Sequence, residues 1–336
     1  MVVANLECAL TESGQPKPYK YATLRSSPQT VTALDRLQVA VLGNNHISDF
    51  GDSGAQETEK TLRAAGIQTV GYGSNLEEAV APVVVERAGM RLAVVSFCCP
   101  TTNGENLATH TSAGVVPLGR ELLRRSITAA RPHADAVLVY MHWGCEQVHD
   151  PVPDQIRLGR QAVEFGADAV VGCHPHVIQS YECYRGRWIF YGLGNFLLGS
   201  VETRSVCPDG TIRTETHRQA LRNRQSLVVR FSVKPHASDG RLALETVMPV
   251  EFAEDYVPRS IPKERLTADI DQLNARLGRY TRAHQAELQR DDEPVFRAEI
   301  RNGRLVYFYN AETIGHHDRQ PLPRLVLRRL RHLLKK

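Results

Sequence analysis

Gly172-Cys173-His174-Pro175-His176-Val177 is the stretch that decides the fold, because it directly follows the apolar run of residues 167–171. Alternate side chains of an extended backbone share one face, so we expect His174 and His176 to lie on the same side of a strand. Two imidazoles placed in this way can bind a metal ion. Taken alone, the pair has a plainer interpretation as two surface histidines in a loop, since a short motif is only a hypothesis.

Three further apolar runs end in the same kind of cluster, which favours the metal interpretation. Residues 137–141 lead into His142-Trp143-Gly144-Cys145-Glu146, and residues 39–42 lead into Gly43-Asn44-Asn45-His46, with Asp49 close behind. Residues 2–4 lead into Asn5-Leu6-Glu7. Nitrogen and oxygen ligands at one edge of a sheet are what a metal site built on strand ends requires.

Length and composition place the chain among globular proteins. Its 336 residues are 42% hydrophobic, so it can bury a substantial core in one or two domains. The 41 basic and 37 acidic residues give a net charge of +4, a balance too even to indicate nucleic-acid binding. We therefore expect no nucleic-acid partner.

Cysteine usage and hydropathy bear on the compartment. The seven cysteines form an odd set without a Cys-x-x-Cys pair, which favours reduced thiols and a cytoplasmic location. No stretch reaches the ~20 apolar residues needed to span a bilayer. The first residues lack the charged and then apolar pattern of a secretion signal.

Periodicity predicts alternating strands and helices, and hence an α/β fold. The predicted helices are residues 52–65, 118–130, 154–165 and 266–288, and Gly66 stands where a cap at the helix end belongs. The predicted strands are residues 68–70, 83–86, 91–97, 226–234, 241–249 and 304–309. Two polar segments are also singled out: residues 11–30 are predicted to be an excursion over the surface that could edge the site, and residues 201–225 are predicted to be a loop.

The last 13 residues, 324–336, place apolar and basic side chains on different faces of a predicted helix. This helix either packs on the domain or lies on an anionic membrane surface as a peripheral contact. The segment Gly192-Leu193-Gly194-Asn195 is likewise open to two interpretations. It is either a tight turn or a close backbone approach to the site.

The assembled motifs resemble those of the CapA family, the bacterial capsule and poly-γ-glutamate synthesis proteins, whose domain is similar to calcineurin-like metallophosphoesterases. The resemblance covers roughly residues 1–200, fades beyond about 250, and runs through five motifs in order. These motifs are Asn5-Leu6-Glu7, Asn44-Asn45-His46 with Asp49, His142-Trp143-Gly144 with Glu146, Gly172-x-His174-Pro175-His176, and Leu193-Gly194-Asn195-Phe196.

The resemblance implies a metallophosphoesterase-like sandwich of two mixed β-sheets flanked by helices. It assigns two divalent ions, Mn, Fe or Zn, to a site at the strand ends. The implied metal ligands are Glu7, Asn45, His142, His174 and His176, with Asn5 as an alternative to Glu7. His46 would act as the catalytic acid, oriented by Asp49. Asn5, Asn44, Glu146 and Asn195 would orient ligands or contact substrate, although Glu146 has an equal claim to be a surface residue.

One departure from the family pattern concerns the start of the chain. Family members begin with a strand ending in Gly-Asp well before the Asn-Leu-Glu motif, whereas only four residues precede Asn5 here. The N-terminal strand and a ligand are therefore expected to be missing, either because Met1 is internal to a longer protein or because a central strand has been lost. We favour the longer protein, since loss of an inner strand would expose unpaired backbone. An N-terminal signal or anchor would be hidden by the same gap.

Two cysteines near the histidines are also open to two interpretations. Cys145 and Cys173 could serve as thiolate ligands, but inert packing is the commoner role of a buried cysteine. On a strand, Cys173 is expected to point away from the histidine face.

Two functions follow from the resemblance. One is a metal-dependent, phosphoesterase-like hydrolase acting in capsule or poly-γ-glutamate synthesis, on an anionic polymer or phosphoester substrate. The other is a non-catalytic accessory subunit of an exopolymer synthesis and export complex. The expected domains are residues 1–255, which carry the family resemblance, and residues 256–336, a helical and β extension with the basic end. The protein is expected to be cytoplasmic, with membrane association as the alternative.

Overall fold

A six-stranded mixed sheet lies at the centre of the fold, with strand order β12-β13-β11-β10-β8-β7. The four inner strands are parallel to one another, and the two edge strands are antiparallel to their neighbours. Inner strands of this kind are covered on both faces, which explains their nearly continuous apolar sequences. The strands are β7 Val83–Arg87, β8 Met90–Cys98, β10 Ala136–His142, β11 Ala169–Cys173, β12 Tyr181–Tyr184 and β13 Arg187–Phe190.

A smaller parallel sheet packs against it. Its strand order is β1-β4-β5, and its strands are β1 Val3–Asn5, β4 Val39–Val41 and β5 Gln68–Val70. Val41 and Val70 from this sheet share one hydrophobic cluster with Leu138, Tyr140 and Val171 from the larger sheet. The predicted sandwich of two sheets is therefore confirmed, with the smaller sheet parallel throughout its described strands.

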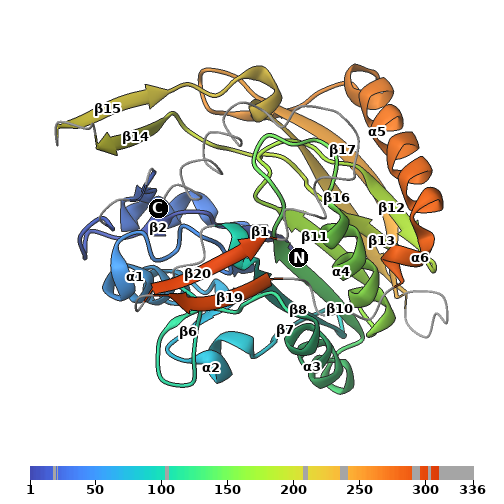
Figure 1. Ribbon diagram of the computed structural model, residues 1–336, viewed down its shortest axis with the longest axis horizontal. Helices are drawn as coiled ribbons and strands as arrows, with labels where there is room; N and C mark the ends of the chain where they lie inside the picture. Colours follow the sequence, from blue (N-terminus) through green and yellow to red (C-terminus); the bar gives the residue numbers. More distant parts are fainter. Residues whose placement is uncertain are drawn as a thin grey trace. The chain divides into compact units, whose positions relative to one another are not determined.

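Helices cover the outer faces of the sandwich. The helices are α1 Gly51–Ala64, α2 Leu76–Val80, α3 Arg120–Ala130, α4 Pro153–Glu164, α5 Glu264–Ala283 and α6 Gln285–Leu288. Figure 1 shows α3 and α4 side by side next to β10 and β11, with which they are in contact. Helix α1 packs Ala55 and Leu62 against Ala40 and Leu42 of the smaller sheet. It ends at Ala64, and Gly66, with a φ of +77° just beyond the helix end, completes the predicted cap.

A third sheet packs against the larger one, and its residues Phe231 and Leu242 contact the same hydrophobic cluster. It is antiparallel, with strands β16 Gln225–Val233, β17 Leu242–Phe252 and β18 Pro258–Ser260. Leu266 and Ile270 of α5 pack with Leu227 of β16. The predicted antiparallel pair and the predicted helix of residues 266–288 are both confirmed, apart from a break between α5 and α6.

The predicted loop of residues 201–225 is wrong. The chain forms an antiparallel hairpin of β14 Val201–Val206 and β15 Ile212–His217, followed by the 3-10 helix η4 Leu221–Arg224. No apolar alternation marks β15 in the sequence, because Arg213, Thr214 and Thr216 are polar and solvent-exposed.

Short elements complete the connections. They are the paired strands β2 Ala9–Leu10 with β3 Arg25–Ser26 and β6 Tyr72–Gly73 with β9 Gly114–Val115, and the 3-10 helices η1 Pro28–Leu34, η2 Pro100–Thr102 and η3 Arg131–His133. Strand β2 precedes the polar excursion predicted for residues 11–30, whereas β3 and the start of η1 lie within it, and this excursion reaches the site described below.

The structure describes residues 1–17, 20, 22–102, 106–206, 211–234, 241–289, 296–301 and 304–309. The chain divides into two compact units, Met1–Pro294 and Val295–Lys336. In the second unit, β19 Phe296–Arg301 pairs antiparallel with β20 Arg304–Tyr309, which confirms the predicted late strand. The predicted amphipathic helix of residues 324–336 lies outside the described residues. The expected boundary near residue 255 concerns sequence relationship and stays a prediction.

Among the helices that the structure describes, none is both long enough and apolar enough to span a membrane.

Candidate metal centre

The carboxyl ends of β1, β4, β10 and β11 bring together the clusters singled out in the sequence. Glu7 follows β1, Asn45 and His46 follow β4, His142 is the last residue of β10, and His174 follows β11. His142 continues the alternation of Leu138 and Tyr140, so its ring faces the smaller sheet. The site therefore lies where the ends of the two packed sheets meet.

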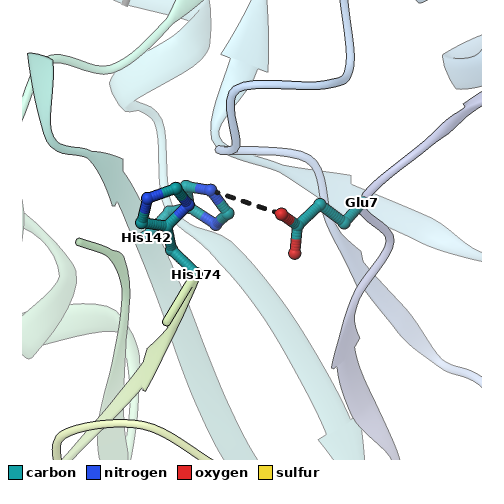
Figure 2. A group of neighbouring side chains, drawn as sticks. All are labelled: Glu7, His142 and His174. Carbon is teal, nitrogen blue, oxygen red and sulfur yellow. Dashed lines mark ion pairs between the residues drawn. The ribbon is translucent and has the colours of Figure 1, made fainter. Parts of the chain in front are cut away.

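Glu7, His142 and His174 form a group whose ligand atoms all lie within 4.8 Å of one another. Figure 2 shows the two imidazoles beside each other, with the Glu7 carboxylate facing them. Glu7 Oε1 is 3.6 Å from His142 Nε2 and 3.5 Å from His176 Nε2. A second group, Glu146, His174 and His176, meets the same 4.8 Å criterion and shares His174 with the first.

The environment of Glu7 Oε1 indicates whether these residues are suited to bind a metal ion. This atom is buried without a hydrogen-bond partner, while the other carboxylate oxygen accepts from Asn5 Nδ2 at 2.9 Å. Burying a carboxylate oxygen without a hydrogen bond costs free energy unless a nearby cation compensates its negative charge. Nitrogen and oxygen ligands that each lie about 2.0 to 2.2 Å from a tetrahedral ion are roughly 3.4 Å apart. The donor set and its spacing therefore fit a divalent cation.

Asn45 joins the first group through His142. The two side chains are in direct contact, with 2.8 Å between Asn45 Oδ1 and His142 Nε2, and both are buried. Five predicted ligands, Glu7, Asn45, His142, His174 and His176, are thus brought together, and Glu146 lies beside the last two.

His46 and Asp49 form a buried pair at the edge of the cluster. His46 Nδ1 lies 2.7 Å from Asp49 Oδ2, and the Asp49 side chain is fully buried. Leu24 N donates to the same oxygen at 2.6 Å, and Lys20 Nζ forms an ion pair with Asp49 Oδ1. Lys20 Nζ also donates to Asn45 O at 2.6 Å. The contact expected between Asp49 and His46 is present, and the polar excursion supplies two of the other partners.

Asn5 and Asn44 link the strand ends to one another. Asn44 Nδ2 donates to Asn5 Oδ1 at 3.1 Å and to Leu6 O at 2.9 Å. Asn44 Oδ1 accepts from His46 N at 3.0 Å. Because Asn5 in turn donates to Glu7, one chain of hydrogen bonds fixes both Glu7 and His46.

A separate network orients His176. Its Nδ1 lies 2.9 Å from Asn195 Oδ1, and Asn195 Nδ2 donates to Asn223 O at 2.9 Å. Asn223 Nδ2 donates to His176 O at 3.0 Å and to Gln147 Oε1 at 2.8 Å. The segment from Gly192 to Asn195 therefore contributes a direct contact to the cluster.

The electrostatic environment differs between the histidines. Burial lowers the pKa of His142 well below its ordinary value, and the neighbouring His174 and His176 lower it further. Burial also acts to lower the pKa of His176, but the Glu7 carboxylate and the Asn195 hydrogen bond outweigh it, so this pKa is raised. His142 is therefore held neutral, which is the form that binds a metal ion.

Two expectations about the central stretch are corrected. Strand β11 ends at Cys173, and His174 and His176 adopt left-handed backbone conformations with φ of +95° and +58°. The two imidazoles thus converge through a bend and not through strand alternation. Cys173 does not point away, since its Sγ lies 3.3 Å from His142 Nδ1. Burial raises the pKa of this thiol well above its ordinary value, which argues against a thiolate ligand.

Sequence reasoning missed Lys20 and Asn223. Lys20 is one of two lysines in the polar excursion, and nothing in the sequence distinguishes it from the other. Asn223 lies on η4, inside the segment predicted as a loop. Both contacts span long sequence separations, 29 residues between Lys20 and Asp49 and 47 between Asn223 and His176, so no local pattern could have revealed them.

Comparison with known proteins places this geometry in context. Residues 1–200 match the model of the family described as "Bacterial capsule synthesis protein PGA_cap". The chain is 34% identical over 195 residues to capsule biosynthesis protein CapA of Bacillus anthracis, covering 56% of this chain and 47% of the relative. It is 32% identical over 203 residues to a probable polyglutamine synthesis accessory protein of Mycobacterium tuberculosis, covering 57% and 53%. The chain spans about half the length of the curated relatives it matches.

Solved structures show more distant likenesses. A putative 5'-nucleotidase from Staphylococcus aureus aligns with a TM-score of 0.44 and 14% identity over 74% of this chain and 44% of that one. The NAD nucleotidase of Haemophilus influenzae aligns with a TM-score of 0.38 and 10% identity, over 72% and 46%. Likeness of this degree carries no argument about activity.

Proposed function

The chain belongs to the family of bacterial capsule synthesis proteins described as PGA_cap, and from this premise we propose that it is a metal-dependent hydrolase of the phosphoesterase type. Its curated relatives are named for capsule or polyglutamate synthesis, so we propose an exopolymer of that kind, or a phosphoester formed during its synthesis, as the substrate class. The observation that carries the proposal is the buried Glu7 Oε1, which has no hydrogen-bond partner and faces the histidine cluster beside the His46–Asp49 pair.

Some residues of the site would bind the metal ions, and others would transfer a proton. Glu7, His142 and His174 would hold one divalent ion, and Glu146 and His176 would hold a second together with the shared His174. Mixed nitrogen and oxygen ligands suit Mn, Fe or Zn. Such ions polarise phosphoryl and carbonyl oxygens and lower the pKa of water.

His46 is the proposed proton donor. Asp49 engages its Nδ1, so Nε2 remains as the nitrogen that can pass a proton to a leaving group. Lys20 and Leu24 N occupy the rest of the Asp49 carboxylate and keep it directed at the ring. Asn5, Asn44 and Asn195 hold Glu7, the His46 backbone and His176 in place.

A non-catalytic accessory role is the second candidate. The mycobacterial relatives are named probable accessory proteins, and a structural cation would satisfy Glu7 as well as a catalytic one. The His46–Asp49 pair distinguishes the two candidates, because holding a cation does not require it.

Two measurements test the proposal. Elemental analysis of purified protein after incubation with excess Mn²⁺ should show bound metal, and the double substitution H174A/H176A should remove most of it, with exposed His133→Ala as the control. Hydrolysis of an aryl phosphodiester should stop on chelation and should fall about 10²- to 10⁴-fold in H46N, the scale expected for a positioned acid. Metal content should be unchanged in H46N.

Each outcome separates the candidates. Wild-type protein without metal contradicts the hydrolase and leaves the accessory role, which does not require a cation. Bound metal with turnover that H46N leaves intact contradicts the assigned role of His46. Bound metal without turnover on phosphoesters or on exopolymer favours the accessory role.

A further inference from the structure

Residues 211–234, which comprise β15, η4 and β16, are strongly basic. They carry six of the 41 Lys and Arg residues of the chain but one of its 37 Asp and Glu residues. Their net charge of +5 exceeds the net charge of the whole chain, which is +4. The excess of positive charge is therefore concentrated in this one segment.

Few of these cations are neutralised within the fold. Arg213 Nη2 lies 2.7 Å from the carboxylate of Glu215, the one acidic residue of the segment. Among the residues that the structure describes, no carboxylate forms an ion pair with Arg218, Arg222 or Arg224. Arg224 is half-buried, and its Nε is buried without a hydrogen-bond partner. A buried N–H donor without a partner costs free energy, so an anion that bound here would compensate it.

The same segment reaches the metal centre. Asn223 stands between two of these arginines in the chain, and its Nδ2 donates to His176 O at 3.0 Å. Its backbone oxygen accepts from Asn195 Nδ2 at 2.9 Å. Asn195 N in turn donates to Gln225 O at 3.2 Å. The arginines thus belong to a segment that directly contacts a proposed metal ligand, and a long substrate bound at the centre could extend over them.

Exposed apolar side chains accompany the arginines. Phe196 and Leu197 are 54% and 52% exposed, and Leu221 of η4 is 51% exposed. The two segments that carry them are joined by a 3.0 Å hydrogen bond from Gln219 Nε2 to Gly199 O. Neighbouring apolar side chains that remain exposed mark surfaces that bind a ligand or partner.

We propose that this surface binds an extended polymer that carries a carboxylate on each repeating unit. Its residues are Arg218, Arg222, Arg224, Phe196, Leu197 and Leu221. The guanidinium groups pair with the carboxylates, and the apolar side chains pack against the methylene groups between them. The inference rests on the proposed function, and of the two substrate classes named there it selects the polymer, because one small phosphoester has too few charges for three arginines.

Other partners of a basic surface fit these observations less well. A bilayer surface attracts arginines, but it cannot enter a site whose residues Asn45, His142 and His174 are buried, whereas a flexible chain can. Single-stranded nucleic acid is bound by several aromatic side chains that stack on its bases, and this surface has one, Phe196.

The experiment measures binding of fluorescein-labelled poly-γ-glutamate to the metal-free full chain, by fluorescence anisotropy in the presence of a chelator. R218E/R222E reverses two exposed charges of the surface, and R224Q removes the half-buried one. R125E/R279E is the matched control, because it makes the same change at exposed arginines of α3 and α5. Single-stranded DNA and phosphatidylglycerol vesicles are assayed in parallel.

We expect polymer binding to weaken about 10- to 100-fold in R218E/R222E and about 5-fold in R224Q, because each change removes or reverses a charge that pairs with the polymer. The control should bind like wild type, and binding should weaken as salt is raised. An equal loss in the control overturns the proposal, and so does tighter binding of DNA or vesicles than of the polymer. Specific polymer binding by a protein that hydrolyses nothing supports this surface and contradicts the hydrolase. Hydrolysis of the aryl phosphodiester without polymer binding does the reverse.

Discussion

Asp49 uses both carboxylate oxygens inside the fold, and Lys20 is the cation that pairs with it. The Lys20 and Asp49 side chains are 8% and 0% exposed, so this pair is shielded from water. Losing Lys20 would leave the buried carboxylate with the Leu24 amide and His46 as its described partners. Its orientation toward His46 would then be less well determined.

Substituting Lys20 with Met should therefore impair proton transfer more than metal binding. We expect turnover to fall about 10- to 100-fold, the range found when the partner of a site residue is removed. Bound metal, measured by elemental analysis, should stay at the wild-type level. Lys60→Met makes the same change at an exposed position of α1 and should leave turnover unaltered. Equal turnover in K20M and K60M would refute the role given to Lys20.

The lowered pKa of His142 predicts how the free energy of unfolding of the metal-free protein depends on pH. Its pKa in the folded state lies well below the ordinary value of about 6.5, so the unfolded state binds more protons in acid. The free energy of unfolding should accordingly decrease as the pH falls through about 6.5, by at most about 1.4 kcal/mol per pH unit from this group. His176, whose pKa is raised, acts in the opposite sense, stabilising below its unfolded pKa and losing that contribution as the pH rises through its folded pKa.

Urea unfolding in a chelator at several pH values between about 7.5 and 5.5 checks this dependence. H142N removes the titrating group, so its stability should decrease less toward acid than that of wild type. Parallel curves for the two proteins would show that His142 is not the group responsible.

At the scale of elements, the sequence predicted the strands and helices whose apolar residues recur with a regular period. Strands β5 and β20 and helices α1, α3 and α4 lie within about two residues of their expected bounds. The hairpin of β14 and β15 was missed because its side chains lack apolar alternation. The site residues were found because they follow buried strands. The left-handed backbone of His174 and His176 could not be predicted, because only a few per cent of non-glycine residues adopt it and no adjacent glycine or turn motif marks it.

Gly172 shows how closely elements approach behind the site. A Cβ atom here would lie 2.0 Å from Tyr191 O and 2.3 Å from Trp143 Nε1, two atoms joined by a 2.8 Å hydrogen bond. Gly172→Ala should lower the free energy of unfolding by more than about 3 kcal/mol, because backbone must move and a buried hydrogen bond is broken. Gly199→Ala, where a Cβ meets open space, should change it by about 0.5 kcal/mol or less. Urea titration of both variants measures the difference, and similar midpoints would contradict the steric argument.

At the scale of the whole first unit, Asp168 connects segments far apart in the sequence. Its carboxylate accepts from Arg131 Nη1 at 2.5 Å, from Val137 N at 2.9 Å and from Arg241 N at 3.2 Å, and it also pairs with Arg187. The Asp168 side chain is fully buried, so its charge depends on these partners. The contacts join β10, β11, β13 and the approach to β17 at the end of the sheet opposite the metal centre.

Asp168→Asn should consequently destabilise the fold without touching the site. We expect a loss of about 3 to 5 kcal/mol in the free energy of unfolding, the range for breaking a buried ion pair. Asp255→Asn breaks a pair with Arg259 that is exposed on both sides, and its melting temperature should match wild type. Metal affinity of folded D168N should equal that of wild type, and a melting temperature unchanged from wild type would show that Asp168 is dispensable.

The contact between Asn223 and His176 has a consequence for synthesis on the ribosome. Asn223 follows His176 by 47 residues, so at about 5 to 20 residues per second it is translated roughly 2 to 9 s later. During that interval the nascent chain already contains Glu7, His142 and His174, but Asn223, which donates a hydrogen bond to the backbone of His176, has not yet been made. If the two groups bind cations as proposed, we expect the first group to become able to bind one earlier in translation than the second.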